Sequence, residues 1–403
     1  MESKLRVYLD ILGGDAVTPT LPITSQILGR YPEVIEKLSR QNIEFAVHGH
    51  NHLDYTQLTR KEVMGEIRKA AGAFRTHSIQ FSGFRFPYLK WDTNSLEIIR
   101  NSGLFKWDSS HTILWDVVDN ALFDERDLRN YQLMLHQYNY KSSSNWLSLP
   151  KLRHNLTEIP VSLPDDDLLE RLGLRNNKAV TEIWAAILRK THTRGELFTL
   201  QLHPERILVL QDSLKSIIQT AKELQPGVWI ASMSDICDWW TEKENFSIEL
   251  ENRGDSEYQV NVNCSPKATV LVRSNHLSGD EFYNGHRIMS ERSFSIKSRK
   301  KPIVGIPKNS PHELIHFLRN EGFIFETSEE RDKYSVYLDS FDNFSEKNEK
   351  NALEIIHASD LPLIRLWRWP NGCKNCLSIT GDIDCLTLYD FLDRLEHNKT
   401  GKR

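Results

Sequence analysis

Three histidines stand within five residues of one another near the start of the chain. His48, His50 and His52 come directly after the apolar run 43–47. Neutral imidazoles are good ligands for Zn²⁺ and similar divalent ions. One helical turn after a strand would bring His48 and His52 to the same side, and Gly49 would allow the tight turn that begins it. We therefore expect His48 and His52 to bind a metal while His50 points elsewhere; an exposed histidine-rich turn is the alternative.

Two histidines do not complete a metal site, and suitable carboxylates lie near the other end of the sequence. Asp382 and Asp384 end the apolar run that begins at Leu377. Acidic residues at the carboxyl ends of strands in α/β sheets usually belong to an active site. We expect one carboxylate to bind the metal and the other to act as a general base toward water. The alternative is a solvated turn that caps a helix.

Two other expected strands end in residues that could serve hydrolysis. Arg85 could hydrogen-bond a carboxylate through two nitrogens and hold it ionised, and Pro87 would fix the exit of that strand. His203, when protonated, could donate a proton to a departing amine. An ordinary surface arginine and a histidine that caps neighbouring carbonyl groups are the alternatives.

An acidic cluster ends a further strand. Asp165, Asp166 and Asp167 could line a sugar site, or they could tune His203. The same residues could instead form a loop and the cap of a following helix, which we expect for Asp167.

These residues require an α/β framework that brings several strand ends together. In residues 1–240, short β-rich runs alternate with helical patterns, and near-continuous apolar strands of this kind are typical of a parallel sheet or barrel. The expected strands are 16–24, 43–48, 79–87, 156–163, 196–203 and 228–231, and the expected helices are 31–41, 60–76 and 93–102.

The pattern changes after the first 240 residues. Residues 245–300 alternate apolar and polar side chains between turn clusters, which predicts a small antiparallel β-sandwich. Residues 302–360 are mixed and contain an expected helix at 310–321, and the chain ends in an apolar strand and an expected helix at 386–397. We therefore expect four parts: the main α/β barrel (1–240), the sandwich (245–300), a connecting region (302–360), and a C-terminal strand and helix that complete the barrel (361–403).

Composition argues against several classes of function. The 403 residues carry a formal net charge of −4, which gives no electrostatic reason to expect a nucleic-acid partner. No apolar run is long enough for a transmembrane segment, and the N-terminus lacks the apolar stretch of a secretory signal. The five cysteines are few and unevenly spaced, which argues against a disulfide framework. The single CxxC pair, Cys373 and Cys376, is best explained as two small buried residues beside a strand. We expect a cytoplasmic protein.

Together, the polar segments resemble the polysaccharide deacetylase family, also described as the NodB-homology or carbohydrate esterase 4 group. The family pattern consists of T-x-D-D or T-x-D-x-D, H-x-x-x-H, R-x-P-Y/F, a sugar-site segment and L-x-L-H. This chain has corresponding segments at 380–384, 48–52, 85–88, 164–166 and 200–203. The resemblance covers residues 1–240 and 361–400.

The resemblance implies a role for each segment. Asp384, His48 and His52 would bind a divalent metal, most simply Zn²⁺. Asp382 would be the general base, held by Arg85, and His203 would be the general acid. The residues implied in substrate binding are Tyr88, Pro87, Asp165, Asp166 and Leu202.

The activity that follows is removal of N-acetyl groups from amino sugars of a polysaccharide or glycan precursor, by attack of metal-bound water. The implied substrate is an N-acetylated glycan. Two other functions stay open: a non-catalytic glycan-binding relative with an incomplete barrel, and an amidase that acts on a small non-polymeric amide. The oligomeric state also stays open.

The order of the segments departs from the family pattern. The aspartate segment normally comes first, and here it comes last. One interpretation is a circularly permuted domain, a distorted parallel (β/α)7-type barrel whose final strand pairs beside residues 16–23; domain termini often lie close together. In the other, residues 1–240 have lost their first strand and 361–403 begin a second, truncated copy, with Asp10 or Asp15 as substitutes. We favour permutation.

Overall fold

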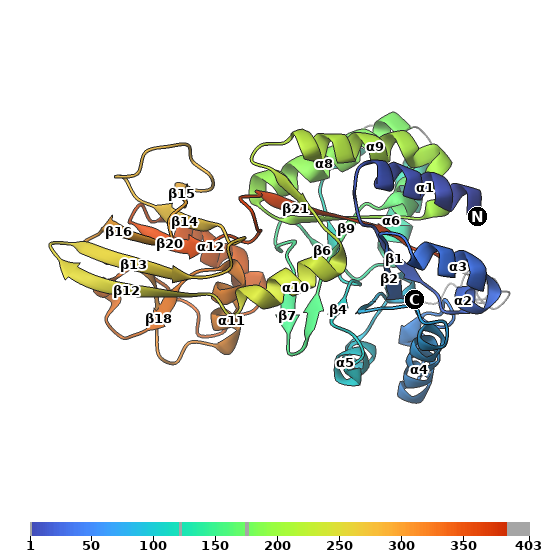
Figure 1. Cartoon of the computed structure of the whole chain (residues 1–403), viewed down its shortest axis with the longest axis horizontal. Coiled ribbons are helices and arrows are strands. Elements are labelled where there is room, and N and C mark those ends of the chain that lie inside the picture. Colours follow the sequence, from blue (N-terminus) through green and yellow to red (C-terminus); the bar gives the residue numbers. More distant parts are fainter. Residues whose placement is uncertain (1, 121–122, 174–176, 385–403) are drawn as a thin grey trace.

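The structure, a computed structural model, describes residues 2–120, 123–173 and 177–384. Its elements form two lobes (Figure 1). One lobe is built around a parallel sheet and contains both α1 (Glu2–Gly14) and β21 (Asn375–Gly381). The helix expected at 386–397 lies outside the described residues. None of the described helices is long and apolar enough to cross a membrane.

The main sheet confirms the expected α/β class. Its strands run in the order β10-β21-β1-β2-β3-β4-β8-β7, with β11 beside β21. Every pair is parallel except β7 with β8. The strands not yet defined are β10 (Leu197–Leu202), β1 (Thr20–Ile23), β2 (Glu44–Val47), β3 (Gly83–Phe84), β4 (Trp107–Asp108), β8 (Leu156–Glu158), β7 (Lys151–Arg153) and β11 (Val228–Ile230).

A second parallel sheet extends two of these strands. β5 (Thr112–Leu114) follows β4, β9 (Val161–Leu163) follows β8, and both belong to a sheet with β6 (Tyr140–Ser142). The expected single strand 156–163 is therefore broken in two, and Pro160, which has no N–H to donate to a ladder, stands at the break. β9 contacts β10, although no ladder joins them among the described residues. The result is a distorted, incompletely closed barrel.

The last described strand lies between the first strand and β10. In β21, Thr380 is in register with Thr20 of β1, and Ile379 with Leu200 of β10. All residues of β21 are buried, as expected for a strand inside a sheet that helices cover. The main chain continues this pairing beyond β21, because Asp382 N donates to Leu202 O (3.1 Å). Residues 382–384 are thereby placed beside the carboxyl ends of the neighbouring strands.

Helices surround the barrel, and side-chain caps fix several of their starts. Thr59 and Glu62 form a capping box at the start of α4, and Asp92 and Ser95 do the same for α5. Both helices have the predicted bounds. The helices of this lobe, besides α1, are α2 (Gln26–Arg30), α3 (Pro32–Ser39), α4 (Arg60–Thr76), α5 (Thr93–Ser102), α6 (Glu125–Leu135), α7 (Asp166–Arg171), α8 (Asn177–Arg194), α9 (Ile207–Glu223) and α10 (Met233–Lys243).

The second lobe contains two antiparallel sheets, as the alternating pattern suggested. One has the order β12-β13-β16 and the other β15-β14-β20. Their bounds are β12 (Ser247–Gly254), β13 (Glu257–Asn263), β14 (Val270–Arg273), β15 (His286–Met289), β16 (Ser293–Lys297) and β20 (Leu363–Leu366). Because β20 pairs with β14, the segment after residue 361 first completes a sheet of this lobe and only then enters the barrel.

A small parallel sheet, β18-β17-β19, completes the second lobe. It consists of β17 (Lys301–Ile306), β18 (Phe325–Thr327) and β19 (Tyr334–Tyr337), with helices α11 (His312–Glu321) and α12 (Glu349–Ala358). The two lobes share buried packing, because Trp107, Leu197 and Cys376 of the barrel belong to the same apolar cluster as Val270 and Ile364. Figure 1 shows the chain passing from the second lobe into the barrel just before β21.

Candidate functional site

The two predicted histidine ligands lie in a loop after β2, and the helical turn expected there is not formed. Gly49 has φ +81°, and a Cβ on it would lie 2.8 Å from Asn51 O, so the chain turns sharply at a residue that must be glycine. Glu66 of α4 then fixes the conformation of the loop, because its Oε2 accepts a hydrogen bond from Asn51 N (3.0 Å). The loop nevertheless brings His48 and His52 together, with ring centroids 5.0 Å apart.

His50 points away from this pair, as predicted. Its Nδ1 lies 2.8 Å from the hydroxyl of Ser25. His48, by contrast, is almost fully buried, and its Nδ1 lies 2.9 Å from the carbonyl oxygen of Arg85. A carbonyl only accepts, so Nδ1 of His48 carries a proton, and Nε2 is the nitrogen that faces Asp384.

Asp384 meets both imidazoles. Its Oδ1 lies 3.4 Å from His48 Nε2 and 3.2 Å from His52 Nε2, and ligand atoms of all three residues lie within 4.8 Å of one another. Burial raises the pKa of Asp384, but the neighbouring imidazoles outweigh it and hold the pKa well below its usual value. Asp384 is therefore ionised.

These three residues fit a divalent metal. Asp384 Oδ1 is buried but makes no hydrogen bond with any described residue, although two imidazole nitrogens face it. A buried carboxylate oxygen without a hydrogen bond is costly unless something else neutralises it. Two imidazoles and a carboxylate form the protein ligand set of many catalytic zinc sites. We call Asp384, His48 and His52 the metal triad.

Asp382 lies two residues before the triad's carboxylate and is paired with Arg85. Arg85 Nη1 donates to Asp382 Oδ1 (2.6 Å) and to Thr380 Oγ1 (2.9 Å). The guanidinium group is fully buried, and the carboxylate is nearly so. The predicted arginine–carboxylate pair is thus formed, although through one nitrogen of Arg85 and not two.

His203 ends β10 and is held by Asp166. The Nδ1 of His203 lies 2.8 Å from Asp166 Oδ1, and its backbone N–H donates to Asp166 Oδ2 (2.8 Å). Burial lowers the pKa of His203, but the charge of Asp166 outweighs it and raises the pKa well above the ordinary value. Asp384 and Asp382 raise it further, so the histidine lies within electrostatic reach of the triad and of Asp382.

The acidic cluster differs from the prediction. The helix cap is Asp165, whose side chain accepts from Leu168 N (3.0 Å), and not Asp167. The chain enters α7 two residues earlier than expected, which places Asp166 in its first turn, beside His203. Asp167 instead pairs with Arg206, whose Nη2 lies 2.7 Å from its Oδ1.

The remaining predicted substrate residues lie around the same edge. The Tyr88 ring lies edge-on to His52, with centroids 4.2 Å apart, and Tyr88 Oη donates to His52 O (3.3 Å). Pro87 is buried beside Gly49. The side chain of Leu202 lies in the apolar core, and its carbonyl accepts from Asp382 N.

Several residues of this edge were missed by sequence reasoning. Nothing in its sequence position singles out Ser109, yet its carbonyl and hydroxyl oxygens both accept hydrogen bonds from Arg85. Arg206 contacts Asp166, with Nη1 3.2 Å from Oδ2. Arg206 could have been noticed in the sequence, because it is a charged residue three positions after His203, about one helical turn further along the chain. Ser109 offered no such signal.

The CxxC pair takes no part in this site. Cys373 is half-buried, Cys376 is buried in β21, and both are free thiols. The expected burial holds for Cys376, whereas Cys373 lies before the strand and is partly exposed. Cys385 lies outside the described residues.

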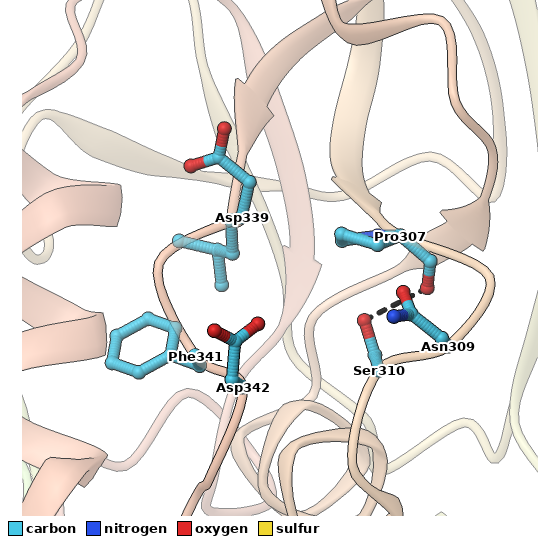
Figure 2. A pocket seen from close by; sticks show the side chains of 7 residues that line it. Pro307, Asn309, Ser310, Asp339, Phe341 and Asp342 are labelled. Carbon is cyan, nitrogen blue, oxygen red and sulfur yellow. Dashed lines mark hydrogen bonds between the residues drawn. The ribbon is translucent and has the colours of Figure 1, made fainter.

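A separate hollow opens in the second lobe, beyond the carboxyl ends of β17 and β19 (Figure 2). Its lining residues are Pro307, Asn309, Ser310, Leu338, Asp339, Phe341 and Asp342. Asp339 is paired with Arg331 (Nη1 to Oδ2, 2.5 Å). None of these residues belongs to the metal triad or contacts His203, so we assign the hollow no part in the chemistry.

Comparison with known proteins supports the resemblance to the polysaccharide deacetylase family for the first part of the chain. Residues 3–106 match the model of the polysaccharide deacetylase family, and this range includes both triad histidines and Arg85. A structure described as a probable polysaccharide deacetylase from Pseudomonas aeruginosa PAO1 is 17% identical, covers 59% of this chain and 72% of its own, and has a TM-score of 0.46. The structure of Puue allantoinase is 16% identical over the same shares, with a TM-score of 0.46. No curated protein matches the sequence.

Proposed function

We propose that this chain belongs to the polysaccharide deacetylase family and is a metal-dependent hydrolase that removes N-acetyl groups from amino sugars of a polysaccharide or glycan precursor. The observation that carries the proposal is the meeting of three groups at one edge of the barrel. They are the metal triad, a carboxylate held by an arginine, and a histidine held by a carboxylate. Hydrolysis of an amide needs each of these functions.

Asp384, His48 and His52 would hold the ion, and we propose Zn²⁺ because two imidazoles and one carboxylate suit it. When bound, a divalent ion supplies Lewis acidity, which polarises carbonyl groups and makes water more acidic. The hydrogen bond from His48 Nδ1 to Arg85 O would fix the ring and leave Nε2 as the nitrogen that binds the ion, which is the usual role of such an outer contact.

Asp382 is the proposed general base. Its contact with Arg85 Nη1 fixes one of its oxygens, so the other oxygen is available to accept a proton from water. As the water oxygen bonds to the acetyl carbon, its proton passes to Asp382. The carbonyl π electrons move to the carbonyl oxygen and give a tetrahedral intermediate.

His203 is the proposed general acid. The Nδ1–H of His203 donates to Asp166, which leaves Nε2–H to protonate the sugar nitrogen as the C–N bond breaks. The raised pKa keeps the imidazole protonated at neutral pH, and the charge of Asp166 stabilises that form. The products are acetate and a free amine.

The substrate contacts are part of the same proposal. The half-buried ring of Tyr88 lies against His52 and offers an aromatic face of the kind that sugar rings stack on. Pro87 and Leu202 would support the site by packing behind it, since both side chains are buried. Asp165 and Asp166 would act mainly through the position of His203, because both carboxylates are already buried.

We also propose that the chain is a circularly permuted form of the family's barrel. The support is the place of β21, which pairs on one side with β1 and on the other with β10. The division into four parts, 1–240, 245–300, 302–360 and 361–403, stays a proposal. It differs from the structure in one respect: β20, which was assigned to the C-terminal part, pairs with β14 in the second lobe. A cytoplasmic location also stays a prediction.

Acetate release provides the test. Purified protein loaded with Zn²⁺ should release acetate from a β-1,4-linked N-acetylglucosamine tetramer faster than from N-acetylglucosamine or a small non-sugar N-acetyl amide. Activity on the small amide alone would favour an amidase. Zinc binding without acetate release from any of them would favour a non-catalytic glycan-binding protein.

A further inference from the structure

The segment Asp108-Ser109-Ser110 begins at the last residue of β4 and leads toward β5, and neither the family pattern nor the proposed mechanism gives it a role. All three residues are fully buried. Buried polar residues are normally hydrogen-bonded, so their hydrogen-bond partners indicate which residues this segment positions.

Ser109 accepts two hydrogen bonds from one edge of the guanidinium group of Arg85. Arg85 Nε donates to the carbonyl oxygen of Ser109 (2.8 Å), and Nη2 donates to its hydroxyl (2.9 Å). The remaining nitrogen, Nη1, is the one that contacts Asp382. Because the guanidinium group is planar and rigid, fixing Nε and Nη2 fixes the direction in which Nη1 points.

Asp108 and Ser110 fix the backbone on either side of Ser109. Asp108 Oδ2 accepts from the hydroxyl of Ser110 (2.9 Å), and that hydroxyl accepts from Phe86 N (2.9 Å). On the other side, Ser109 N donates to Phe84 O (2.9 Å). The segment is therefore bonded to the residues directly before and after Arg85, as well as to its side chain.

We propose that Ser109 is a positioning residue: it orients Arg85, which in turn orients the carboxylate of Asp382, while Asp108 and Ser110 hold Ser109 in place. The proposal rests on the proposed function of Asp382 as base. Loss of the Ser109 hydroxyl leaves the charge of Arg85 unchanged but frees one edge of its guanidinium group. The chemical step should slow, whereas metal and substrate binding should not change.

The experiment compares Ser109→Ala with the wild-type holoenzyme on the β-1,4-linked N-acetylglucosamine tetramer. We expect kcat to fall about tenfold, the effect of losing one hydrogen bond to a charged group, with KM and bound zinc unchanged. Ser162→Ala is the matched control, because Ser162 is an equally buried serine bonded to Trp115 and not to Arg85. It should keep wild-type kcat.

A double-mutant cycle separates positioning from a general structural role. In an Arg85→Ala background, Ser109→Ala should change kcat by less than about twofold, since the partner it orients is gone. Ser110→Ala, which removes the bridge to Phe86, should give a smaller loss of the same kind. An unchanged kcat in Ser109→Ala, or an equal loss with and without Arg85, overturns the proposal.

If the wild-type protein releases no acetate, the proposed function fails and the positioning claim is judged by crystallography. In the Ser109→Ala structure, the guanidinium group of Arg85 should turn away from Asp382. An Arg85 that keeps its contact with Asp382 in that structure overturns the claim, whatever the reaction is.

Discussion

Asp384 Oδ1 lies 3.2 Å from His52 Nε2, although the two residues come from opposite ends of the chain. The contact exists because β21 enters the sheet between β1 and β10, so that the residues after it stand beside the loop after β2. A site assembled this way depends on the whole barrel, since neither half of the chain contains a complete set of ligands.

The first prediction concerns the base. Asp382→Asn keeps the shape of the side chain and its contact with Arg85 but cannot accept the proton from water. Turnover should fall by about 10²–10⁴-fold, the usual contribution of general catalysis. Zinc content should stay at the wild-type level, because the metal triad is untouched. Acetate release and metal analysis measure the two quantities, and full turnover in this variant would remove the role.

The second prediction concerns pH. Asp166→Asn removes the charge that raises the pKa of His203, so the pKa should fall. The protonated acid would then be lost at lower pH, and the alkaline limb of the kcat profile should move in that direction. Asp167→Asn is the control, because Asp167 pairs with Arg206. A limb that moves equally in both variants would contradict the assignment of Asp166.

A third prediction links Asp108 to stability. Burial raises the pKa of Asp108 from its ordinary value of 3.8 to about 7. Between these values the folded chain binds more protons than the unfolded chain, so this residue makes the free energy of unfolding fall as pH rises from about 4 to 7. Asp108→Asn should flatten that part of the dependence. Urea unfolding at pH 5 and pH 7.5 checks it; identical slopes for both proteins would be the contrary result.

A fourth prediction tests packing under Arg85. A Cβ on Gly83 would lie 2.0 Å from the buried ring of Trp107, whose Nε1 is already bonded to Ser234. Gly83→Ala should therefore destabilise the fold by at least about 1–3 kcal/mol. Gly72→Ala in α4 meets nothing within 4 Å and should be neutral or stabilising. Denaturant unfolding of both variants decides; equal stability would argue against this packing.

The sequence allowed the strand ends to be found but not all of their local geometry. Apolar runs followed by His48, Arg85, His203 and Asp382 predicted that these residues end strands of one parallel sheet, and their positions follow from that rule. The bounds of α4 and α5 were predictable because their caps use side chains of the residues next to the helix start.

Other features depended on contacts between distant segments. The loop after His48 is shaped by Glu66, which the spacing of the histidines could not reveal, and the expected helical turn was wrong for that reason. The cap at Asp165 is decided by the contact of Asp166 with His203. The pairing of β20 with β14 joins segments that the alternation pattern alone could not connect.

Metal analysis of Asp384→Asn tests the central claim most directly. After dialysis against buffer without metal, the wild-type chain should retain about one Zn²⁺, and Asp384→Asn should retain far less while staying folded. Asp15→Asn is the control. Asp15 lies near the N-terminus and pairs with Lys222, so this variant should bind as much Zn²⁺ as the wild type does. Equal zinc in Asp384→Asn and the wild type would contradict a site shared between the two ends of the chain.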